Sequence, residues 1–332
     1  MRSLLITLSL VALIALVSLA GIGLWYRSYL VTPAPGQGEV VVDIPRGAGV
    51  RGIGALLAAH GVLDNDIRYL AMVYFSGLQT KLKAGEYSIP LGMTPPQVLE
   101  LLVSGQTLRH HVTIPEGLTA AQIAAVFEQE GWVKQARFLA LVRDAAFIRQ
   151  LGIEADSLEG YLFPETYTLV RNEADEAAII RMMVARFQQI WQGLVLPESL
   201  ELNRHQLLTL ASVVEKETGV AAERPLIARV FYNRLAKKMR LQADPTVIYG
   251  LPDFNGNLTK ADLKKETPYN TYLIPGLPPG PICNPGLAAL EAVLHPVESD
   301  ALYFVAKNDG THIFSTNLAD HNRAVQHYQR GQ

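Results

Sequence analysis

Val42-Asp43-Ile44-Pro45-Arg46-Gly47 recurs later in the chain as Val112-Thr113-Ile114-Pro115-Glu116-Gly117. Two further pairs of segments match in the same order: 68–73 with 137–142, and 87–90 with 161–164. Each copy begins with a β-branched run and continues with apolar residues at helical spacing, which predicts a strand, two helices and a second strand. The repeat therefore predicts an α+β chain that contains two β-α-α-β units.

The sequence between the matched segments places the elements of each copy. The first copy is predicted to contain strands at 40–44 and 85–89 and helices at 50–60, 67–75 and 95–103, the last with Thr94 as its N-cap. The second copy runs from His110 to about Thr168, and its first helix begins after Thr119 and ends at Gly131. Beyond it we expect a long helix at 172–192, short helices and Pro/Gly-rich loops from Arg204, a hairpin of strands at 301–305 and 312–314, and a closing helix at 318–328.

The N-terminus is strongly apolar. Leu4 to Tyr26 is an almost unbroken apolar run between Arg2 and Arg27, and about 20 such residues cross a bilayer. By the positive-inside rule the N-terminus is cytoplasmic and the body lies outside the membrane. A cleaved signal peptide is the alternative, because Ser18-Leu19-Ala20 resembles a cleavage site. Either form exports the body, and the Pro/Gly-rich residues 31–38 are predicted to be a short spacer.

Composition argues against several classes of function. The net charge of −2 lacks the basic character of a nucleic-acid-binding protein. Cys283 is the single cysteine, the eight histidines are scattered, and no cluster has the spacing of a metal site. We therefore expect neither a metal nor a cofactor, and no nucleic-acid partner.

Two carboxylates close a predicted helix in the segment QLLTLASVVEKET, residues 206–218. Glu215 and Glu217 lie at the C-terminal end, where the helix dipole favours cations and so raises their proton affinity. Glu217 shares a row of the helix with Leu210, Val213 and Val214, and apolar neighbours raise a carboxyl pKa further, as a general acid requires. Glu215 has a similar row, and both could instead be surface carboxylates that pair with Lys216 or Arg224. The spacing alone does not choose between them.

Three loops that follow this helix are rich in tyrosine, amides, proline and glycine: RLQADPTVIYG (240–250), TPYNTY (267–272) and GLPPGP (276–281). Tyrosine rings stack on sugar faces, and amide and carboxylate groups bind hydroxyl and acetamido groups. Each loop alone is compatible with ordinary turn chemistry, but together they suggest a saccharide groove. The candidate substrate-binding residues are Gln242, Asp244, Thr246, Tyr249, Tyr269, Asn270 and Tyr272, with Asn317 and His321 as weaker candidates.

The ordered series EKET (215–218), RLQADPTVIYG, YNTY (269–272), GLPPGPICNPG (276–286), YFVA (303–306) and 314–321 resembles the MltG (YceG-like) family of membrane-anchored endolytic murein transglycosylases. The resemblance covers nearly the whole chain and implies that Glu217 is catalytic. It implies an anchor at 1–30, a linker at 31–39, a LysM-like module at 40–106 and a YceG-like catalytic domain at 107–330, in which 107–170 is the second repeat unit and 204–330 carries the active site.

The resemblance also implies a reaction and a location. One glutamate would act first as acid and then as base, cutting the bond between N-acetylmuramic acid and N-acetylglucosamine and leaving a 1,6-anhydro end. The partners would be peptidoglycan glycan strands, the bacterial inner membrane that the chain crosses once, and peptidoglycan synthases, with the catalytic body on the periplasmic side. A muramidase, which needs a second carboxylate such as Asp244 or Glu223, and a non-catalytic glycan-binding scaffold remain the alternatives.

Overall fold

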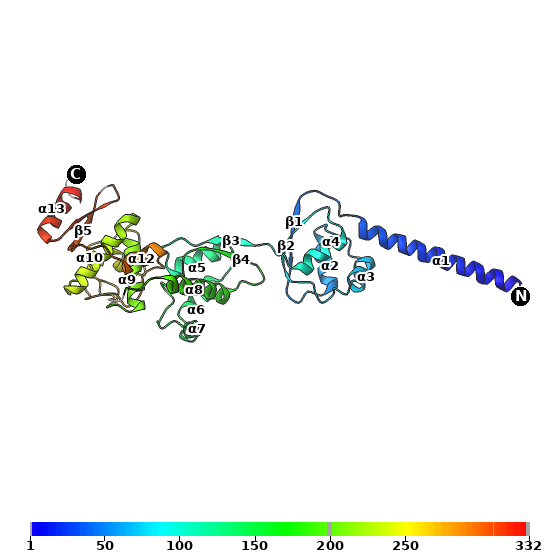
Figure 1. Cartoon of the computed structure of the whole chain (residues 1–332), viewed down its shortest axis with the longest axis horizontal. Helices are drawn as coiled ribbons and strands as arrows, with labels where there is room; N and C mark the ends of the chain where they lie inside the picture. The colour runs from blue at the N-terminus through cyan, green and yellow to red at the C-terminus, as the bar shows by residue number, and fades with distance from the viewer. Residues whose placement is uncertain (1, 198–200, 308, 330–332) are drawn as a thin grey trace. The chain divides into compact units, whose positions relative to one another are not determined.

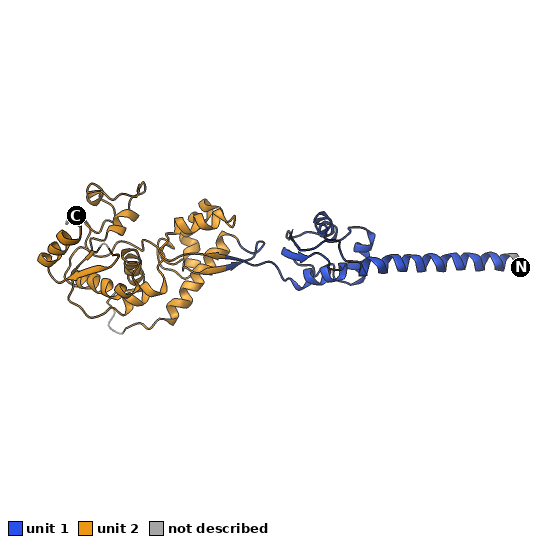
Figure 2. Cartoon of the chain, turned by 90° about the horizontal axis from the view of Figure 1, so that it is seen from above, with its two compact units in different colours: residues 1–111, 168–174 blue, residues 112–167, 175–332 orange. Residues whose placement is uncertain are grey.

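A computed structural model describes residues 2–197, 201–307 and 309–329 (Figure 1). The predicted end of the catalytic domain at residue 330 lies outside these residues. The chain divides into two compact units, which Figure 2 colours separately: the first contains 1–111 together with Thr168–Ala174, and the second contains Val112–Tyr167 and the chain from Asp175 on. The architecture is α+β, as predicted, and within the described residues the strands form three two-stranded sheets.

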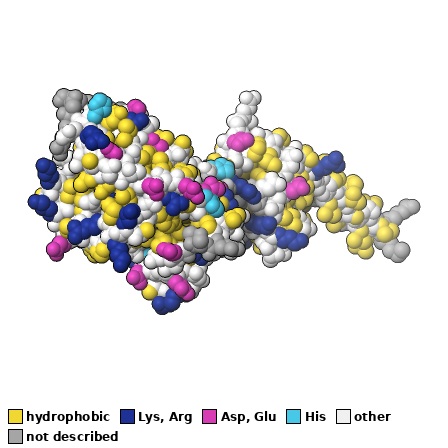
Figure 3. Space-filling view, turned by 60° about the vertical axis from the view of Figure 1, so that its left-hand side comes forward, with side chains coloured by type: hydrophobic (Ala, Val, Ile, Leu, Met, Phe, Trp, Pro, Cys, Tyr) yellow, Lys and Arg dark blue, Asp and Glu magenta, His cyan; other side chains and the backbone are white. Residues whose placement is uncertain are grey.

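The first helix, α1, covers Arg2–Val31. Its segment Leu4–Val31 is long and apolar enough to cross a membrane, and no other helix of the described residues meets that test. Hydrophobic side chains cover this part of the chain in the space-filling view (Figure 3). A membrane anchor and a signal sequence both have this form.

The rest of the first unit is a small module whose elements agree with the prediction. Its elements are β1 (Glu39–Ile44), α2 (Val50–Ala59), α3 (Ile67–Phe75), β2 (Gly85–Pro90) and α4 (Pro95–Ser104). β1 and β2 are antiparallel, with Val42 opposite Tyr87, and both of these side chains are buried in the core. Asp66 caps α3 by accepting from the amide of Arg68 at 2.8 Å. The β-α-α-β order predicted from the repeat is therefore confirmed for the first copy.

The second copy departs from the first at its end. It contains β3 (His110–Thr113), α5 (Ala120–Gln129), α6 (Gln135–Val142) and β4 (Thr166–Leu169), but a further helix, α7 (Ala145–Gln150), precedes β4. The segment 161–164, which matches strand β2 in sequence, is not a strand. Tyr161, Leu162 and Phe163 are buried, and the amide of Leu162 donates to the Asn284 side chain at 2.8 Å instead of to a neighbouring strand.

The remaining elements include one helix that is buried over most of its length. They are α8 (Glu176–Gly193), α9 (Arg204–Glu217), η1 (Ala221–Glu223), α10 (Arg224–Ala236), α11 (Asp244–Tyr249), η2 (Asp262–Lys264), α12 (Leu287–Leu294), β5 (Tyr303–Ala306), β6 (His312–Ser315) and α13 (Leu318–Gln329). β5 and β6 form the predicted antiparallel hairpin. α8 begins later than predicted because Asp175 caps it. α9 packs against α10, α11 and α12, and residues 207–214 of it are all buried.

The proline-rich loop at 276–286 is locked against the second repeat copy. Asn284 is fully buried, and its side chain bonds the amide of Leu162, the carbonyl of Leu118 at 3.0 Å and the Glu159 carboxylate at 3.0 Å. Gly160 has φ of 88°, and a Cβ there would lie 2.5 Å from Cγ of Pro281. Only glycine suits both the left-handed backbone and this close approach. The loop is therefore packed closely against the second repeat copy.

Candidate active site

The structure places Glu217 at the last position of α9. The helix begins with a capping box, in which the Asn203 side chain accepts from the amide of Gln206 and the Gln206 side chain accepts from the amide of Asn203. At the other end Thr218 is extended, with φ of −145° and ψ of 137°, so the chain turns away directly after Glu217. A buried, well-capped helix thus presents one carboxyl at its C-terminal end.

The surroundings of Glu217 favour its neutral form. Burial, and secondly the negative charge of Asp244, raises the pKa of Glu217 to about 8, while the Arg234 guanidinium acts in the opposite direction. Among the described residues none forms a hydrogen bond or ion pair with this carboxyl. Glu217 also keeps some solvent-accessible surface, although it is mostly surrounded by protein. It is therefore mostly protonated near pH 7, and its proton is free for a bound substrate.

Glu215 is the other carboxylate of the pair, and each of its two oxygens accepts a hydrogen bond. Its Oε1 accepts from Nη2 of Arg224 at 3.2 Å, and its Oε2 accepts from the amide of Gly286 at 3.0 Å. Its side chain is only 6% exposed. Burial, and secondly the negative charge of Glu215, raises the pKa of the neighbouring Glu116. The pairing of Glu215 with Arg224 was one of the alternatives, but the pair is buried and does not lie on the surface. Glu217 has no such ion-pair partner among the described residues.

Arg234 supplies a fixed positive charge near Glu217. Its Nε donates to the carbonyl of Leu302 and its Nη1 to the carbonyl of Leu241, both at 2.7 Å, and its guanidinium lies 5.2 Å from the ring centre of Tyr303. The side chain is buried, and burial lowers the pKa of the guanidinium below its usual value. Because these bonds hold the guanidinium in place, it can stabilise the carboxylate that Glu217 becomes after giving up a proton.

Two of the predicted groove residues lie beside Glu217. The Tyr272 hydroxyl donates to Oδ1 of Asp244 at 2.6 Å, and the pKa of this tyrosine is raised by burial, Asp244 and Glu217. Asp244 is exposed and begins α11. Gln242, two residues earlier, has an exposed side chain and a φ of 50°, which is strained for a non-glycine residue. The amide of Gln242 donates to the carbonyl of Thr271 at 3.2 Å, so the strained position is held by the neighbouring loop.

Thr246 and Asn270 occupy a different place from the one predicted. Both are fully buried, with no surface that a glycan could contact. The Thr246 hydroxyl donates to the carbonyl of Ala243 at 2.6 Å, and the Asn270 amide donates to the carbonyls of Leu263 and Lys265. They fix the shapes of the two loops and leave contact with substrate to their exposed neighbours. Because both side chains are buried, we do not include them among the groove residues proposed below. Sequence alone does not show which polar groups of a loop point inward.

Tyr249 and Tyr269 form a second cluster at the other end of α11. Their ring centres are 4.7 Å apart, and the Tyr249 hydroxyl donates to Oε2 of Glu159 at 3.2 Å. Burial raises the pKa of Glu159 to about 7, although it accepts bonds from Ala120, Tyr249 and Asn284. Asp244 and Tyr249 are five residues apart on a helix, which corresponds to about 7.5 Å along its axis. α11 therefore connects the tyrosine pair to the Glu217 cluster over roughly the length of a sugar unit or two.

Three buried residues of this region were not predicted: Glu159, Asn284 and Arg234. Burial of Arg234 could have been predicted from the sequence, because it continues the apolar row of α10 formed by Ile227, Val230 and Phe231. Glu159 is a lone charge beside the apolar run 161–163, a weaker signal. Asn284 gave none beyond its position in the proline-rich loop.

The remaining polar candidates, Glu223, Asn317 and His321, form contacts with other residues of the fold. Glu223 accepts from the amide of His312 at 2.9 Å and contacts Nδ1 of the same residue at 2.7 Å, and these contacts lower its pKa. Asn317 caps α13, accepting from the amide of Asp320 at 2.9 Å. The His321 ring stacks on Tyr303 at 5.1 Å. The described residues contain no group of three histidines, cysteines or carboxylates placed to hold a metal.

Comparison with known proteins shows which family the chain is similar to. The model of the YceG-like family matches residues 42–327. The chain is 34% identical over 323 residues to the endolytic murein transglycosylase of Bacillus subtilis, covering 91% of this chain and 89% of that protein. It is 33% identical over 353 residues to the enzyme of the same name from Streptococcus pneumoniae D39, covering 96% of this chain but 64% of that longer protein. A crystal structure of a YceG-like protein from Listeria monocytogenes has 34% identity and a TM-score of 0.57, covering 87% of this chain.

Proposed function

Because the chain belongs to the YceG-like family, we propose that it is an endolytic murein transglycosylase that cuts peptidoglycan glycan strands between N-acetylmuramic acid and N-acetylglucosamine. The observation that carries the proposal is the state of Glu217. Burial and the charge of Asp244 raise its pKa to about 8, and no described residue forms a hydrogen bond or ion pair with it. It lies at the C-terminal end of α9, within the electrostatic range of the Arg234 guanidinium. A general acid for glycosidic cleavage at neutral pH needs this combination.

In the first step Glu217 donates its proton to the glycosidic oxygen. The bond from that oxygen to C1 of the muramoyl sugar breaks, and the N-acetylglucosamine hydroxyl leaves with the proton. Positive charge develops at C1, where the acetamido group of the same sugar can stabilise it. Glu217 is now an anion, and the Arg234 charge that lowers its pKa stabilises this form.

In the second step the same residue acts as a base. The Glu217 carboxylate removes the proton of the C6 hydroxyl, and the C6 oxygen bonds to C1 of the same sugar. This gives the 1,6-anhydro end, restores the protonated Glu217 and consumes no water. Gln242, Asp244, Tyr249, Tyr269 and Tyr272 are the proposed groove residues, because each of these side chains is at least partly accessible.

One observation favours a muramidase as the second candidate. Asp244 lies close enough to Glu217 to raise its pKa, so a second carboxylate is present near the acid, as a hydrolase requires. The position of Asp244 weighs against that role, because it already accepts from the Tyr272 hydroxyl. A carboxylate held this way is suited to keeping Glu217 protonated.

The products distinguish the two reactions. Purified full-length protein is incubated with isolated peptidoglycan, and the released fragments are analysed by mass spectrometry beside a muramidase digest. We expect muropeptides that end in 1,6-anhydro-N-acetylmuramic acid, one water lighter than the reference ends. Reducing muramic acid ends would establish the muramidase instead. Binding of glycan without any soluble fragments would establish a scaffold.

The Asp244 charge should also set the pH range of activity. The acid must be protonated, so kcat/KM of the wild-type enzyme should fall as the pH rises through about 8. Asp244→Asn removes the charge that helps to raise the Glu217 pKa, and its alkaline limb should therefore shift to lower pH. Tyr272→Phe is the matched control, because it removes the hydrogen bond to Asp244 but keeps the charge. An identical alkaline limb in Asp244→Asn and wild type would show that these two carboxyls are not coupled.

The N-terminal helix and the module complete the proposal. We propose that α1 is a membrane anchor, that the body acts on the periplasmic side, and that the module at 40–106 is LysM-like and holds glycan. An enzyme anchored in this way would act on strands close to the membrane, where peptidoglycan synthases extend them.

A further inference from the structure

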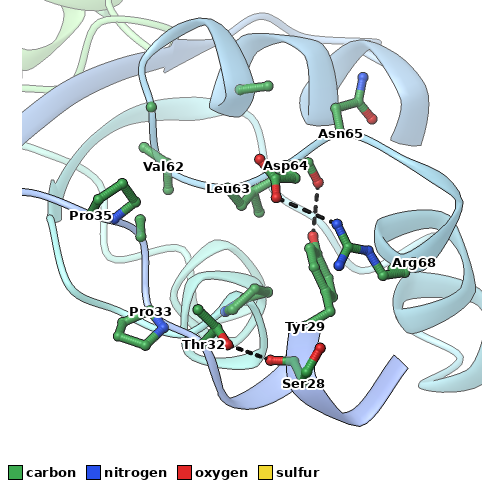
Figure 4. Close-up of a pocket in the computed structure, with 14 residues that line it drawn as sticks. Ser28, Tyr29, Thr32, Pro33, Pro35, Val62, Leu63, Asp64, Asn65 and Arg68 are labelled. Carbon is green, nitrogen blue, oxygen red and sulfur yellow. Dashed lines mark hydrogen bonds and ion pairs between the residues drawn. The ribbon is translucent and has the colours of Figure 1, made fainter. Parts of the chain in front are cut away.

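The end of α1 is built into the core of the following module. Tyr29 is 5% exposed and belongs to the same buried cluster as Val42, Tyr87 and Leu102, and its hydroxyl donates to the carbonyl of Asp64 at 2.9 Å. Figure 4 shows this ring directed into the module, beside a cavity of about 360 Å³. The membrane helix and the module are therefore one structural body at this point.

Arg68 of α3 reinforces this connection. Its guanidinium lies 4.9 Å from the ring centre of Trp25 and 4.7 Å from that of Tyr29, and Asp66 holds it through Nε at 2.8 Å. The segment after α1 is also packed, because the amide of Ala34 donates to the carbonyl of Met93 at 3.3 Å and Pro33 and Pro35 line the cavity. The residues predicted to be a spacer therefore run along the module and do not separate it from the helix.

The outward face of α3 is apolar, which is the reverse of an ordinary surface helix. Ile67 is 64% exposed, Tyr74 58% and Phe75 83%. These residues are spaced i, i+7 and i+8, so they share one face. Tyr26 of α1 contacts this face, with its ring perpendicular to that of Phe75 and the two ring centres 6.4 Å apart. The apolar surface of α1 thus continues onto α3.

The length of α1 indicates the level in the bilayer at which the exposed face of α3 lies. A hydrocarbon core of about 30 Å takes about 20 helical residues, so a span that begins at Leu4 ends near Leu24. Trp25 and Tyr26 then lie in the interfacial layer, where these residue types concentrate, and the exposed Arg27 lies at the level of lipid phosphates. Phe75, in contact with Tyr26, lies at the same level.

We infer that the C-terminal end of α3 is immersed in the interfacial layer of the bilayer that α1 crosses. The module then lies directly on the periplasmic surface of that same membrane. The partner is lipid, because the exposed face is continuous with the surface of a membrane helix and is aromatic like an interfacial belt. The inference rests on the proposed membrane anchoring of α1. It deepens that proposal, because the module would be held against the bilayer and not joined to α1 by a flexible spacer.

Spin labels on the full-length protein in lipid nanodiscs test the inference. Cys283 is buried, so labels attach at introduced cysteines. Phe75→Cys is the test position and Ile67→Cys a second position on the same face. Val41→Cys is the matched control, an exposed apolar residue (48%) on β1, which Figure 1 places at the end of the module away from α1. Leu13→Cys reports on the membrane span itself. Accessibility to oxygen marks lipid, and accessibility to a water-soluble nickel chelate marks water.

We expect the label at position 75 to be several-fold more accessible to oxygen than to nickel, and the label at position 41 to show the reverse. Equal behaviour at 75 and 41 would overturn the inference, as would a label at 75 shielded from both reagents, which would indicate a protein partner or a second copy. The label at position 13 separates these results from failure of the anchor, since it must lie in lipid if α1 spans the membrane. Release of anhydro fragments by the same preparation tests the enzymatic proposal independently.

Discussion

Glu217→Gln should reduce the release of anhydromuropeptides by between about 10²- and 10⁴-fold, the usual contribution of a general acid–base residue. Glutamine has nearly the same shape but can neither give nor take the proton, so both steps of the reaction lose their catalyst. The measurement is the initial rate of fragment release from peptidoglycan by the full-length variant, with glycan binding followed separately. Binding should be retained, because the groove residues are unchanged. A variant that cuts at the wild-type rate would exclude Glu217 as the acid.

The same substitution should stabilise the protein at alkaline pH. The pKa of Glu217 rises from 4.5 to about 8 on folding, so the folded state holds its proton to a higher pH than the unfolded state does. Stability from this group is therefore fully present below 4.5 and is lost as the pH rises through about 8. Glutamine does not titrate, so the melting temperature of the variant relative to wild type should be higher at pH 9 than at pH 5. A difference that does not depend on pH would show that the pKa of Glu217 is not raised in the folded protein.

Local sequence patterns were sufficient to predict most elements of the first unit. The helices α3 and α4 begin next to side chains that can cap them, and the strands β1 and β2 have clear β-branched or alternating character. Such signals are contained within a few residues. In the second copy a distant contact overrides such signals. The segment 161–164 resembles a strand in sequence, but the amide of Leu162 bonds to Asn284, more than a hundred residues away.

The choice between the two glutamates also depended on distant residues. Glu215 is fixed by Arg224, nine residues later, and by Gly286, 71 residues later. Helical spacing places both glutamates at the end of α9, but it contains no information about a partner supplied by the loop at 276–286. The same applies to Thr246 and Asn270, whose polar side chains turned inward to hold loop backbones. Residue types in the site were predictable, whereas their individual roles required the tertiary contacts.

Glu215→Ala should destabilise the catalytic unit by about 3–5 kcal/mol, since it leaves a buried cation without its partner. Arg224 is only 12% exposed, and the amide of Gly286 would lose its acceptor as well. For a unit of this size the melting temperature should fall by roughly 6–20 °C. Thermal unfolding of the full-length protein in detergent, followed by circular dichroism, measures the effect.

A double-mutant cycle separates the ion pair from the loss of packing. Arg224→Met should be destabilising by itself, but Glu215→Ala combined with Arg224→Met should cost less than the sum of the two single changes, because no unpaired charge remains. Glu215→Gln keeps an acceptor for Gly286 and should therefore cost less than Glu215→Ala. Folded Glu215→Gln should still release anhydro fragments, which is the opposite of the result for Glu217→Gln. If instead Glu215→Gln were fully stable and inactive while Glu217→Gln remained active, the two glutamates would have to exchange roles, and the ion pair with Arg224 would then belong to the catalytic machinery.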